Sequence, residues 1–304
     1  MEGLKHEQIK EKLRGPEKTV LTLYVNRKEQ EKKIFKIERS YVATKTVVYD
    51  YNKDIIMIKV KKFNKHTVAN IQNILKNAQI ELGSNIKGII LDLRGNPGGL
   101  LKQSIKVADL FLTQGRLSET RGRHPDSLQF YRAGGRDMAN GRPIVVLVDG
   151  KSASAAEVTA AALQDRGRAI IVGTSSFGKG TVQTIIDLPN KGEITLTWSH
   201  LITPSGYTLH GLGVYPMVCT SGFDENKDDG GAVLEKAQAE RIKTTAILKA
   251  WRNTNYSDKK KRNELRSFCP PEQRKVDLDN KVAVAILEDK NFYTRTLKVL
   301  TAAQ

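Results

Sequence analysis

Residues 144 to 183 constrain the fold most strongly, because they contain two short apolar runs separated by a stretch of small residues. The runs Ile144 to Asp149 and Ala169 to Gly173 have the pattern of fully buried strands. Between them, Glu157 to Gln164 fits a helix, which Gly167 ends. A strand, a helix and a second strand of this length make a βαβ unit. The sequence therefore predicts an α/β fold.

Two residues that can carry chemistry follow these two predicted strands. Ser154 lies in the turn into the helix, where outward-pointing amide groups would stabilise an oxyanion. Lys179 lies between Gly178 and Gly180, after the second strand, and the glycines allow it to lie close against backbone. The strands of a βαβ unit are neighbours or near neighbours, so we expect Lys179 to reach Ser154.

Each of these residues also has a simpler interpretation. A serine after a strand is commonly a helix N-cap, and a Gly-Lys-Gly sequence is commonly a surface turn. Ser152 is the nearest alternative nucleophile. Residues 178 to 181 also resemble the end of a P-loop, but the glycine four residues before the Gly-Lys pair is missing, so no nucleotide site is predicted.

Several separated motifs resemble those of the carboxyl-terminal processing peptidases, also called tail-specific proteases. That family has a serine in S-A-S-A-S-E, a lysine in F-G-K-G and a glutamine after it; the matching residues here are Ser154, Lys179 and Gln183. The resemblance covers roughly residues 1 to 220 and includes three further segments, L-D-L-R-G-N-P-G-G at 91 to 99, T-P-S-G at 203 to 206 and G-V at 213 to 214. Two positions depart from the family pattern, Ala156 in place of serine and Met217 in place of aspartate, and neither removes a catalytic group.

The resemblance implies a Ser-Lys dyad. Neutral Lys179 would act as the base for Ser154, and Gln183 would orient the amine. A lysine can serve as a base only when its ammonium loses a proton, which burial favours. The uncharged neighbours of Lys179 suit that requirement, so we expect its side chain to be buried. The oxyanion hole would be formed by the amide of Ala155 and by a glycine of the upstream turn, Gly99 with Gly98 as the alternative.

The expected architecture is a crotonase-like or Clp-protease-like core of stacked βαβ units. We expect the core at residues 41 to 222, a partial PDZ remnant of one helix and two strands at 1 to 40, and a mainly helical C-terminal extension at 223 to 304. The beginning of a PDZ domain, with its carboxylate-binding loop, is not found in residues 1 to 40, so these residues are expected to play no part in peptide binding.

The composition fits a soluble globular protein, with 39% hydrophobic and 27% charged residues. The net charge of +17 suggests nucleic acid, but the basic residues are spread along the chain without interleaved aromatic residues. We therefore expect no nucleic-acid partner and interpret the run Lys259 to Arg262 as a solvated surface. A basic surface could still help an enzyme to meet acidic membranes or acidic polypeptides.

Metal sites and a disulfide framework are not predicted. A single disulfide between Cys219 and Cys269 is possible, but nothing in the sequence supports it. The five histidines lack metal-ligand spacing. His200 and His210 are expected to be ordinary, partly buried side chains. No run of 18 apolar residues suggests a membrane span, and the first 20 residues show no signal peptide. The resemblance nevertheless implies a periplasmic or otherwise exported protein.

The function predicted from the resemblance is a serine endopeptidase that cuts polypeptides near their C-termini through an acyl-enzyme, without a cofactor. The sequence leaves open whether the protein forms a homo-oligomer. One alternative is a truncated, inactive member of the family that acts at most as a binding or interaction protein. The other alternative is an acyl-group enzyme of the wider crotonase-like class, against which the Ser-Lys pair argues, because no acyl-CoA pocket can be located.

Overall fold

The computed structural model describes residues 6–26, 32–40, 45–190, 192–224, 228–273 and 277–302. The chain divides into two compact units, Met1–Lys45 and Thr46–Gln304. Each unit is described by itself below. The helices after residue 223 lie in the same compact unit as the predicted core.

The first unit contains one helix and one two-stranded sheet. Helix α1 (His6–Leu13) is followed by β1 (Val20–Val25) and β2 (Lys33–Glu38), which pair antiparallel. The guanidinium of Arg39 donates to the carbonyl of Leu13 at 3.1 Å, so it satisfies one of the free carbonyls at the end of α1. The predicted helix and two strands are confirmed, whereas the likeness of this unit to a PDZ domain stays a prediction.

The second unit is organised around a six-stranded sheet in the order β12-β9-β8-β5-β4-β3. All neighbouring pairs are parallel except β3 and β4, so β3 is an antiparallel edge strand. The strands are β3 (Val47–Asn52), β4 (Ile55–Val60), β5 (Gly88–Asp92), β8 (Ile144–Val148), β9 (Ile170–Gly173) and β12 (Val218–Cys219).

The crossover helices are α2 (Thr67–Leu82), α3 (Leu101–Asp109) and α4 (Ala155–Asp165), with a short 3-10 turn at Gly83–Asn85 after α2. Together with the strands they form successive βαβ units, which confirms the predicted α/β class.

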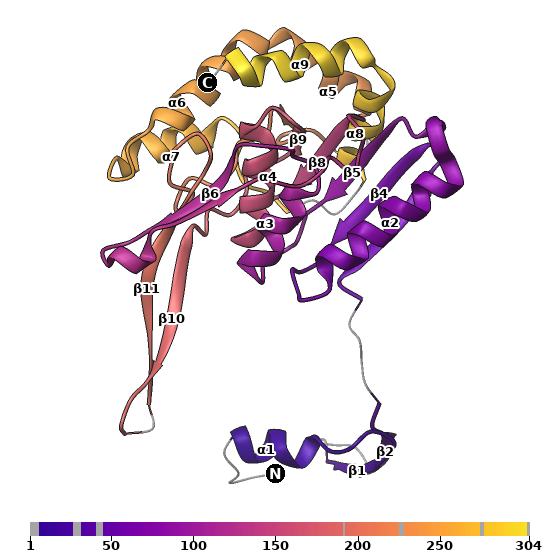
Figure 1. Cartoon of the computed structure of the whole chain (residues 1–304), viewed down its shortest axis with the longest axis vertical. Helices are drawn as coiled ribbons and strands as arrows, with labels where there is room; N and C mark the ends of the chain where they lie inside the picture. Colours follow the sequence, from indigo (N-terminus) through magenta and orange to yellow (C-terminus); the bar gives the residue numbers. More distant parts are fainter. Residues whose placement is uncertain are drawn as a thin grey trace. The chain divides into compact units, whose positions relative to one another are not determined.

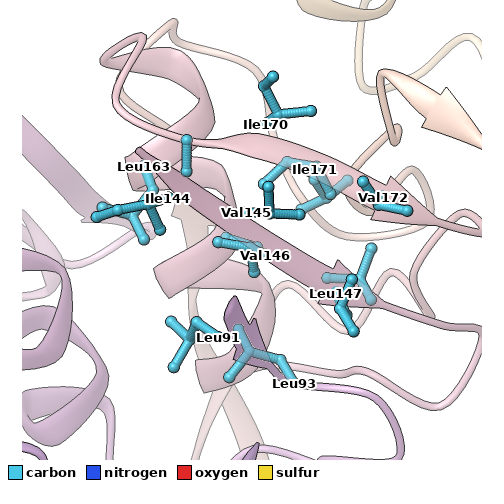
Figure 2. Close-up of a cluster of buried hydrophobic side chains, with 14 of the residues drawn as sticks. Leu91, Leu93, Ile144, Val145, Val146, Leu147, Leu163, Ile170, Ile171 and Val172 are labelled. Atoms are coloured by element: carbon cyan, nitrogen blue, oxygen red, sulfur yellow. The ribbon is translucent and has the colours of Figure 1, made fainter. Parts of the chain in front are cut away.

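The hydrophobic core lies where the central strands meet their helices. Every residue of β5, β8 and β9 is buried, as expected for parallel strands covered on both faces. Figure 2 shows aliphatic side chains of these three strands gathered with Leu163 of α4. Helix α4 is buried along its whole length and is rich in alanine, so it can pack closely against its neighbours. The buried strands are therefore held rigidly, and the turns at their ends start from fixed positions.

A second sheet, in the order β10-β11-β6-β7, projects from the body as a long hairpin (Figure 1). Its strands are β6 (Arg116–Arg121), β7 (Gln129–Arg132), β10 (Thr181–Asp187) and β11 (Glu193–Ile202), with a 3-10 turn at Pro125–Ser127 between β6 and β7. The long hairpin itself consists of β10 and β11. The sequence predicts strands at Thr181 to Asp187 and at Ile194 to Leu201, and β10 and β11 confirm them. For residues 116 to 142 it predicts a long surface loop with strand pieces, and this segment contains β6 and β7.

The C-terminal helices are α5 (Gly230–Ala239), α6 (Arg241–Asn253), α7 (Lys259–Ser267), α8 (Leu278–Glu288) and α9 (Lys290–Ala302). The sequence predicts one helix over Ala232 to Trp251, and this prediction is wrong, because the helix breaks at Glu240 between α5 and α6. Helix α7 includes the run Lys259 to Arg262. Arg262 is buried, so the interpretation of that run as wholly solvated is wrong at this residue.

A disulfide joins Cys219 at the end of β12 to Cys269, just after α7. This bridge is not predicted from the sequence, because the two cysteines are 50 positions apart and only the fold brings them together. The disulfide ties the C-terminal helices to the central sheet, since β12 pairs with β9.

Replacing both cysteines by alanine should lower the free energy of unfolding by roughly 2 to 4 kcal/mol, because the cross-link restricts the unfolded chain. Thermal unfolding of the double variant and of the wild type, each with and without a dithiol reductant, measures this. Reductant should shift the melting temperature of the wild type only. Equal melting temperatures for the two oxidised proteins would contradict the prediction.

Candidate active site

Three turns leave the sheet at the carboxyl ends of β5, β8 and β9. These strands are adjacent and parallel, so their carboxyl ends lie along one edge of the sheet. The turn after β5 contains the glycine sequence 94 to 99, the turn after β8 contains Ser154, and the turn after β9 contains Lys179. The topology thus brings together the three segments that the sequence analysis singled out.

Ser154 occupies a sharp turn between β8 and α4. Its φ of 56° lies in the left-handed region, which costs a serine on the order of 1 to 3 kcal/mol. Strain of this kind persists where the surroundings enforce it, and a sharp strand-to-helix turn presents a nucleophile at the end of a sheet. Ser154 is half-buried, and Ala155 behind it is the first residue of α4, so the Ala155 amide is one of the helix donors without an intrahelical acceptor.

Ser152, the alternative nucleophile, has a different environment. It is fully buried, and its hydroxyl lies 2.9 Å from the carbonyl of Leu93, to which it donates. The same hydroxyl accepts from the amide of Asp149, and the Asp149 carboxylate accepts from the amide of Ser152. These bonds fix the turn after β8, so Ser152 shapes the backbone that holds Ser154.

The carboxylate of Glu157 connects the turns that carry Ser154 and Lys179. Its Oε2 accepts from the amide of Ser154 and from the amide of Lys179, both at 2.8 Å. Its Oε1 accepts from the amide of Gly178 at 2.6 Å and from the hydroxyl of Ser176 at 2.5 Å. One fully buried side chain therefore binds the backbone amides of both Ser154 and Lys179 through a single oxygen. From the sequence, Glu157 is predicted only to begin a helix, although Ser-x-x-Glu is a capping-box pattern that could have marked its contact with Ser154.

Burial raises the pKa of the Glu157 carboxyl above its ordinary value, although its hydrogen bonds oppose the shift. A carboxyl with a higher pKa in the folded chain takes up protons on folding. Its contribution to stability is therefore present below the unfolded pKa and is lost as the pH rises through the folded pKa.

Glu157→Gln should lower kcat by about 10²-fold with a small change in KM. The side-chain nitrogen of glutamine cannot accept a hydrogen bond, so if it faced the amides of Ser154 and Lys179 it would displace their turns. The wild type should also gain stability relative to this variant as the pH is lowered through the folded pKa of Glu157 toward its unfolded pKa. Steady-state kinetics and melting curves across pH measure both effects. An unchanged kcat would show that Glu157 does not position the dyad turns.

The glycine turn after β5 lies directly against Ser154. A Cβ atom at Gly98 would be 2.9 Å from the Ser154 Cβ and 3.1 Å from the Ala155 nitrogen. A Cβ at Gly99 would be 2.1 Å from the carbonyl oxygen of Phe63. Both glycines have positive φ, so the close approach and the conformation both require glycine.

The two glycine amides differ in their hydrogen bonds. The Gly98 amide donates to the side-chain oxygen of Asn96 at 2.8 Å. The Gly99 amide has no acceptor among the described residues, and the same is true of the Ala155 amide. These contacts favour Gly99 over Gly98 as the second donor of an oxyanion hole.

Asn96 holds the glycine turn and was not singled out by the sequence analysis. It is fully buried, and its side-chain amide donates to the carbonyl of Val60 at 2.7 Å. Its backbone carbonyl accepts from Ala153, directly before Ser154. Its position inside R-G-N-P-G-G is the signal that could have marked it as structural to the turn.

The Lys179 side chain is exposed, so the prediction that it is buried is wrong for the chain without a bound substrate. The flanking glycines do lie close against backbone: a Cβ at Gly180 would be 2.1 Å from the His210 nitrogen, and the Gly178 carbonyl accepts from Gly211 at 2.8 Å. The backbone of this loop is therefore fixed while the lysine side chain extends outward.

Gln183 lies on β10, where the register with β11 shifts, and it is also exposed. Within the described part of the chain, the side chains of Ser154, Lys179 and Gln183 form no hydrogen bonds with one another. The structure thus brings together the backbones of Ser154 and Lys179 without joining the three side chains.

The C-terminal helices support the loop against which Gly178 and Gly180 pack. The guanidinium of Arg262 donates to the carbonyls of Thr208, at 2.8 Å, and His210. Arg266 donates to the carbonyl of Leu212, and the Trp251 indole donates to that of Gly213 at 3.2 Å. No motif in the sequence marks these residues, because their partners lie 38 to 54 positions away and only packing brings them together.

His200 and His210 lie close to Tyr256 near this loop, with ring centroids 5.1 Å and 6.3 Å from the tyrosine ring. Both histidines are half-buried, as expected. Burial lowers the pKa of His210, and the neighbouring His200 and Arg262 lower it further. No cluster of His, Cys, Asp or Glu suited to a metal ion occurs among the residues that the structure describes, and none of the described helices could cross a membrane.

Comparison with known proteins identifies the family. Residues 54–219 match peptidase family S41, a span that contains all three turns. A carboxy-terminal-processing protease of Bartonella bacilliformis is 42% identical over 208 residues, which are 68% of this chain and 48% of that protein. A probable CtpA-like serine protease of Staphylococcus epidermidis is 33% identical over 217 residues, 71% of this chain and 43% of the relative.

Among solved structures, the photosystem II D1 C-terminal processing protease superposes with a TM-score of 0.51 and 26% identity. The match covers 66% of this chain and 55% of that one. The chain spans about half the length of the curated relatives it matches. Because the S41 match extends over more than half of the sequence and contains the three turns at the sheet edge, this chain belongs to peptidase family S41.

Proposed function

We propose that this chain is a serine endopeptidase that hydrolyses polypeptides near their C-termini. Membership of family S41 and the names of the relatives support a peptidase that processes C-termini. The observation that carries the proposal is the Glu157 carboxylate, which binds the backbone amides of Ser154 and Lys179 with one oxygen. This contact holds a nucleophile and a base on facing turns.

In the proposed reaction, the neutral amine of Lys179 accepts the proton of the Ser154 hydroxyl as its oxygen attacks the substrate carbonyl. The amides of Gly99 and Ala155 donate to the resulting oxyanion. The protonated lysine then gives its proton to the leaving amine, and an acyl-enzyme remains on Ser154. Water, deprotonated by Lys179, hydrolyses this ester and regenerates both groups.

Because Lys179 is exposed in the chain alone, the proposed reaction requires the bound substrate to shield it from water. A lysine in water is protonated near neutral pH and cannot act as a base. We propose that a bound polypeptide covers Lys179 and removes water from it, as burial favours the neutral amine. Phe177, two residues earlier and 59% exposed, offers apolar surface for this contact. Gln183 would then orient the amine from β10.

The disulfide between Cys219 and Cys269 supports a location of the protein in an oxidising compartment, where such bonds persist. This agrees with the exported location that the sequence resemblance implies. A homo-oligomer also stays a prediction, which the mass of the chain in solution tests.

A direct test is digestion of unstructured polypeptides followed by mass spectrometry of the fragments. The proposal predicts internal cuts close to the C-terminus, which disappear in Ser154→Ala. Removal of single terminal residues, or cuts spread evenly along the substrate, would contradict a C-terminal endopeptidase.

Amidating the C-terminus of a cleaved peptide should change KM little, because the proposed reaction places the scissile carbonyl, and not the terminal carboxylate, against the amides of Gly99 and Ala155. Matched peptides that differ only in the terminal amide measure this. A loss of ten-fold or more in kcat/KM, about 1.4 kcal/mol, would reveal a carboxylate site elsewhere in the chain.

An inactive member of the family that only binds polypeptides is the second candidate. The observation that favours it is the lack of hydrogen bonds between the Ser154, Lys179 and Gln183 side chains in the described chain. A binding protein would retain polypeptide affinity and show no turnover, and its affinity would be unchanged by Ser154→Ala.

A further inference from the structure

We propose that α6 and α9 form a docking surface for an anionic lipid bilayer. The two helices are in contact and lie at the end of the body opposite the tip of the β10–β11 hairpin (Figure 1). Helix α6 carries four basic residues and α9 carries three, and neither carries an acidic residue. This surface is independent of the proposed peptidase site.

The basic side chains converge on one shallow groove between the two helices. Arg241 and Lys249 of α6 and Arg295 and Lys298 of α9 line it, and no acidic residue does. All four are exposed, and Arg241, Lys249 and Arg295 form no ion pair with any described residue. Unpaired cations on one face attract an anionic surface, and each basic residue near an anionic bilayer contributes about 1 kcal/mol.

One exposed aliphatic side chain lies among these basic residues. Ile242 also lines the groove and is 83% exposed. Cations around an apolar residue are typical of a helix that lies in a membrane interface. There the cations bind lipid headgroups while the apolar side chain enters the acyl boundary. What distinguishes Ile242 from other exposed apolar residues is that it lines a groove together with four basic side chains.

Two observations favour a bilayer over nucleic acid. A phosphodiester backbone gains nothing from Ile242, and no aromatic side chain on which a base could stack lines the groove. In addition, the disulfide indicates an oxidising compartment, outside the reducing cytosol and nucleus in which nucleic acids are concentrated. The proposed occupant is therefore an anionic phospholipid surface.

The test is binding of the full chain to sedimented vesicles of phosphatidylcholine with and without phosphatidylglycerol. Binding should require phosphatidylglycerol and weaken as salt is raised. Lys249→Gln combined with Lys298→Gln should raise the apparent Kd roughly 10- to 30-fold. Ile242→Asn should raise it about 3- to 10-fold, because the apolar insertion is lost.

Matched controls exist in α2 and just before it. Ile80 is 82% exposed, so Ile80→Asn makes the same chemical change elsewhere, and Lys65→Gln with Lys76→Gln removes the same charge. Both controls should bind like the wild type. Equal loss in controls and test variants would overturn the proposal, because binding would then follow net charge alone.

A duplex oligonucleotide separates the two polyanions. The proposal predicts that Ile242→Asn weakens vesicle binding and leaves oligonucleotide binding unchanged. If Ile242→Asn has no effect on vesicles and the lysine variant weakens both ligands equally, the face is a general polyanion surface and the bilayer proposal is wrong. Absence of phosphatidylglycerol-dependent binding by the wild type would also overturn it.

Discussion

Ser154→Ala is expected to abolish peptide hydrolysis, with a fall in kcat of about 10³-fold or more, because no acyl-enzyme can form without the hydroxyl. The fold should be unchanged, since the Ser154 contact to Glu157 is made by its backbone amide. The measurement is kcat on a cleaved polypeptide, with a melting curve for each protein.

Ser152→Ala is the matched control for that loss. Ser152 is fully buried and its hydroxyl makes hydrogen bonds within its own turn and to Leu93, so its removal should lower the melting temperature. Any loss of kcat should be smaller than for Ser154→Ala. Full activity in Ser154→Ala, together with loss in Ser152→Ala, would make the assignment of the nucleophile wrong.

Lys179→Arg and Lys179→Met should both be inactive, again by about 10³-fold or more in kcat. A guanidinium keeps its proton and cannot act as a base, and a thioether has no basic nitrogen. Neither variant should alter the melting temperature, because the Lys179 side chain is exposed and only its amide binds Glu157. An active arginine variant would rule out the lysine base.

The pH dependence of the wild type tests how Lys179 becomes neutral. Activity should rise with pH as the amine loses its proton. If the substrate supplies the burial, kcat should reach half of its maximum at a lower pH than kcat/KM, because kcat reports the complex and kcat/KM the free enzyme. A rise near neutral pH that vanishes in His200→Gln or His210→Gln would instead indicate a histidine base.

The sequence was sufficient for the parts of the fold that depend on local pattern. The buried runs after Ile144 and Ala169 became β8 and β9, and the small residues between them became α4. The positions of Ser154 and Lys179 followed, because a βαβ unit places the ends of parallel strands at one edge of the sheet. The order of the sequence motifs also indicates the family.

The contacts that hold the site could not be predicted in the same way. Glu157 reaches Gly178 and Lys179 across more than twenty residues, and Arg262 reaches Thr208 across more than fifty. The disulfide and the exposure of Lys179 depend likewise on packing between segments distant in sequence. Local propensity contains no information about such contacts, so they emerge only from the tertiary fold.

The central claim is that the turns after β5, β8 and β9 form a serine peptidase site in which Lys179 activates Ser154. The most direct measurement is labelling of the full chain with a fluorophosphonate probe in the presence of polypeptide fragments, followed by mapping of the labelled peptide. The account predicts one label, on Ser154, which is lost in Lys179→Arg and strongly reduced in Glu157→Gln. A label on another residue, or equal labelling of Ser154 in the wild type and in Lys179→Arg, would contradict it.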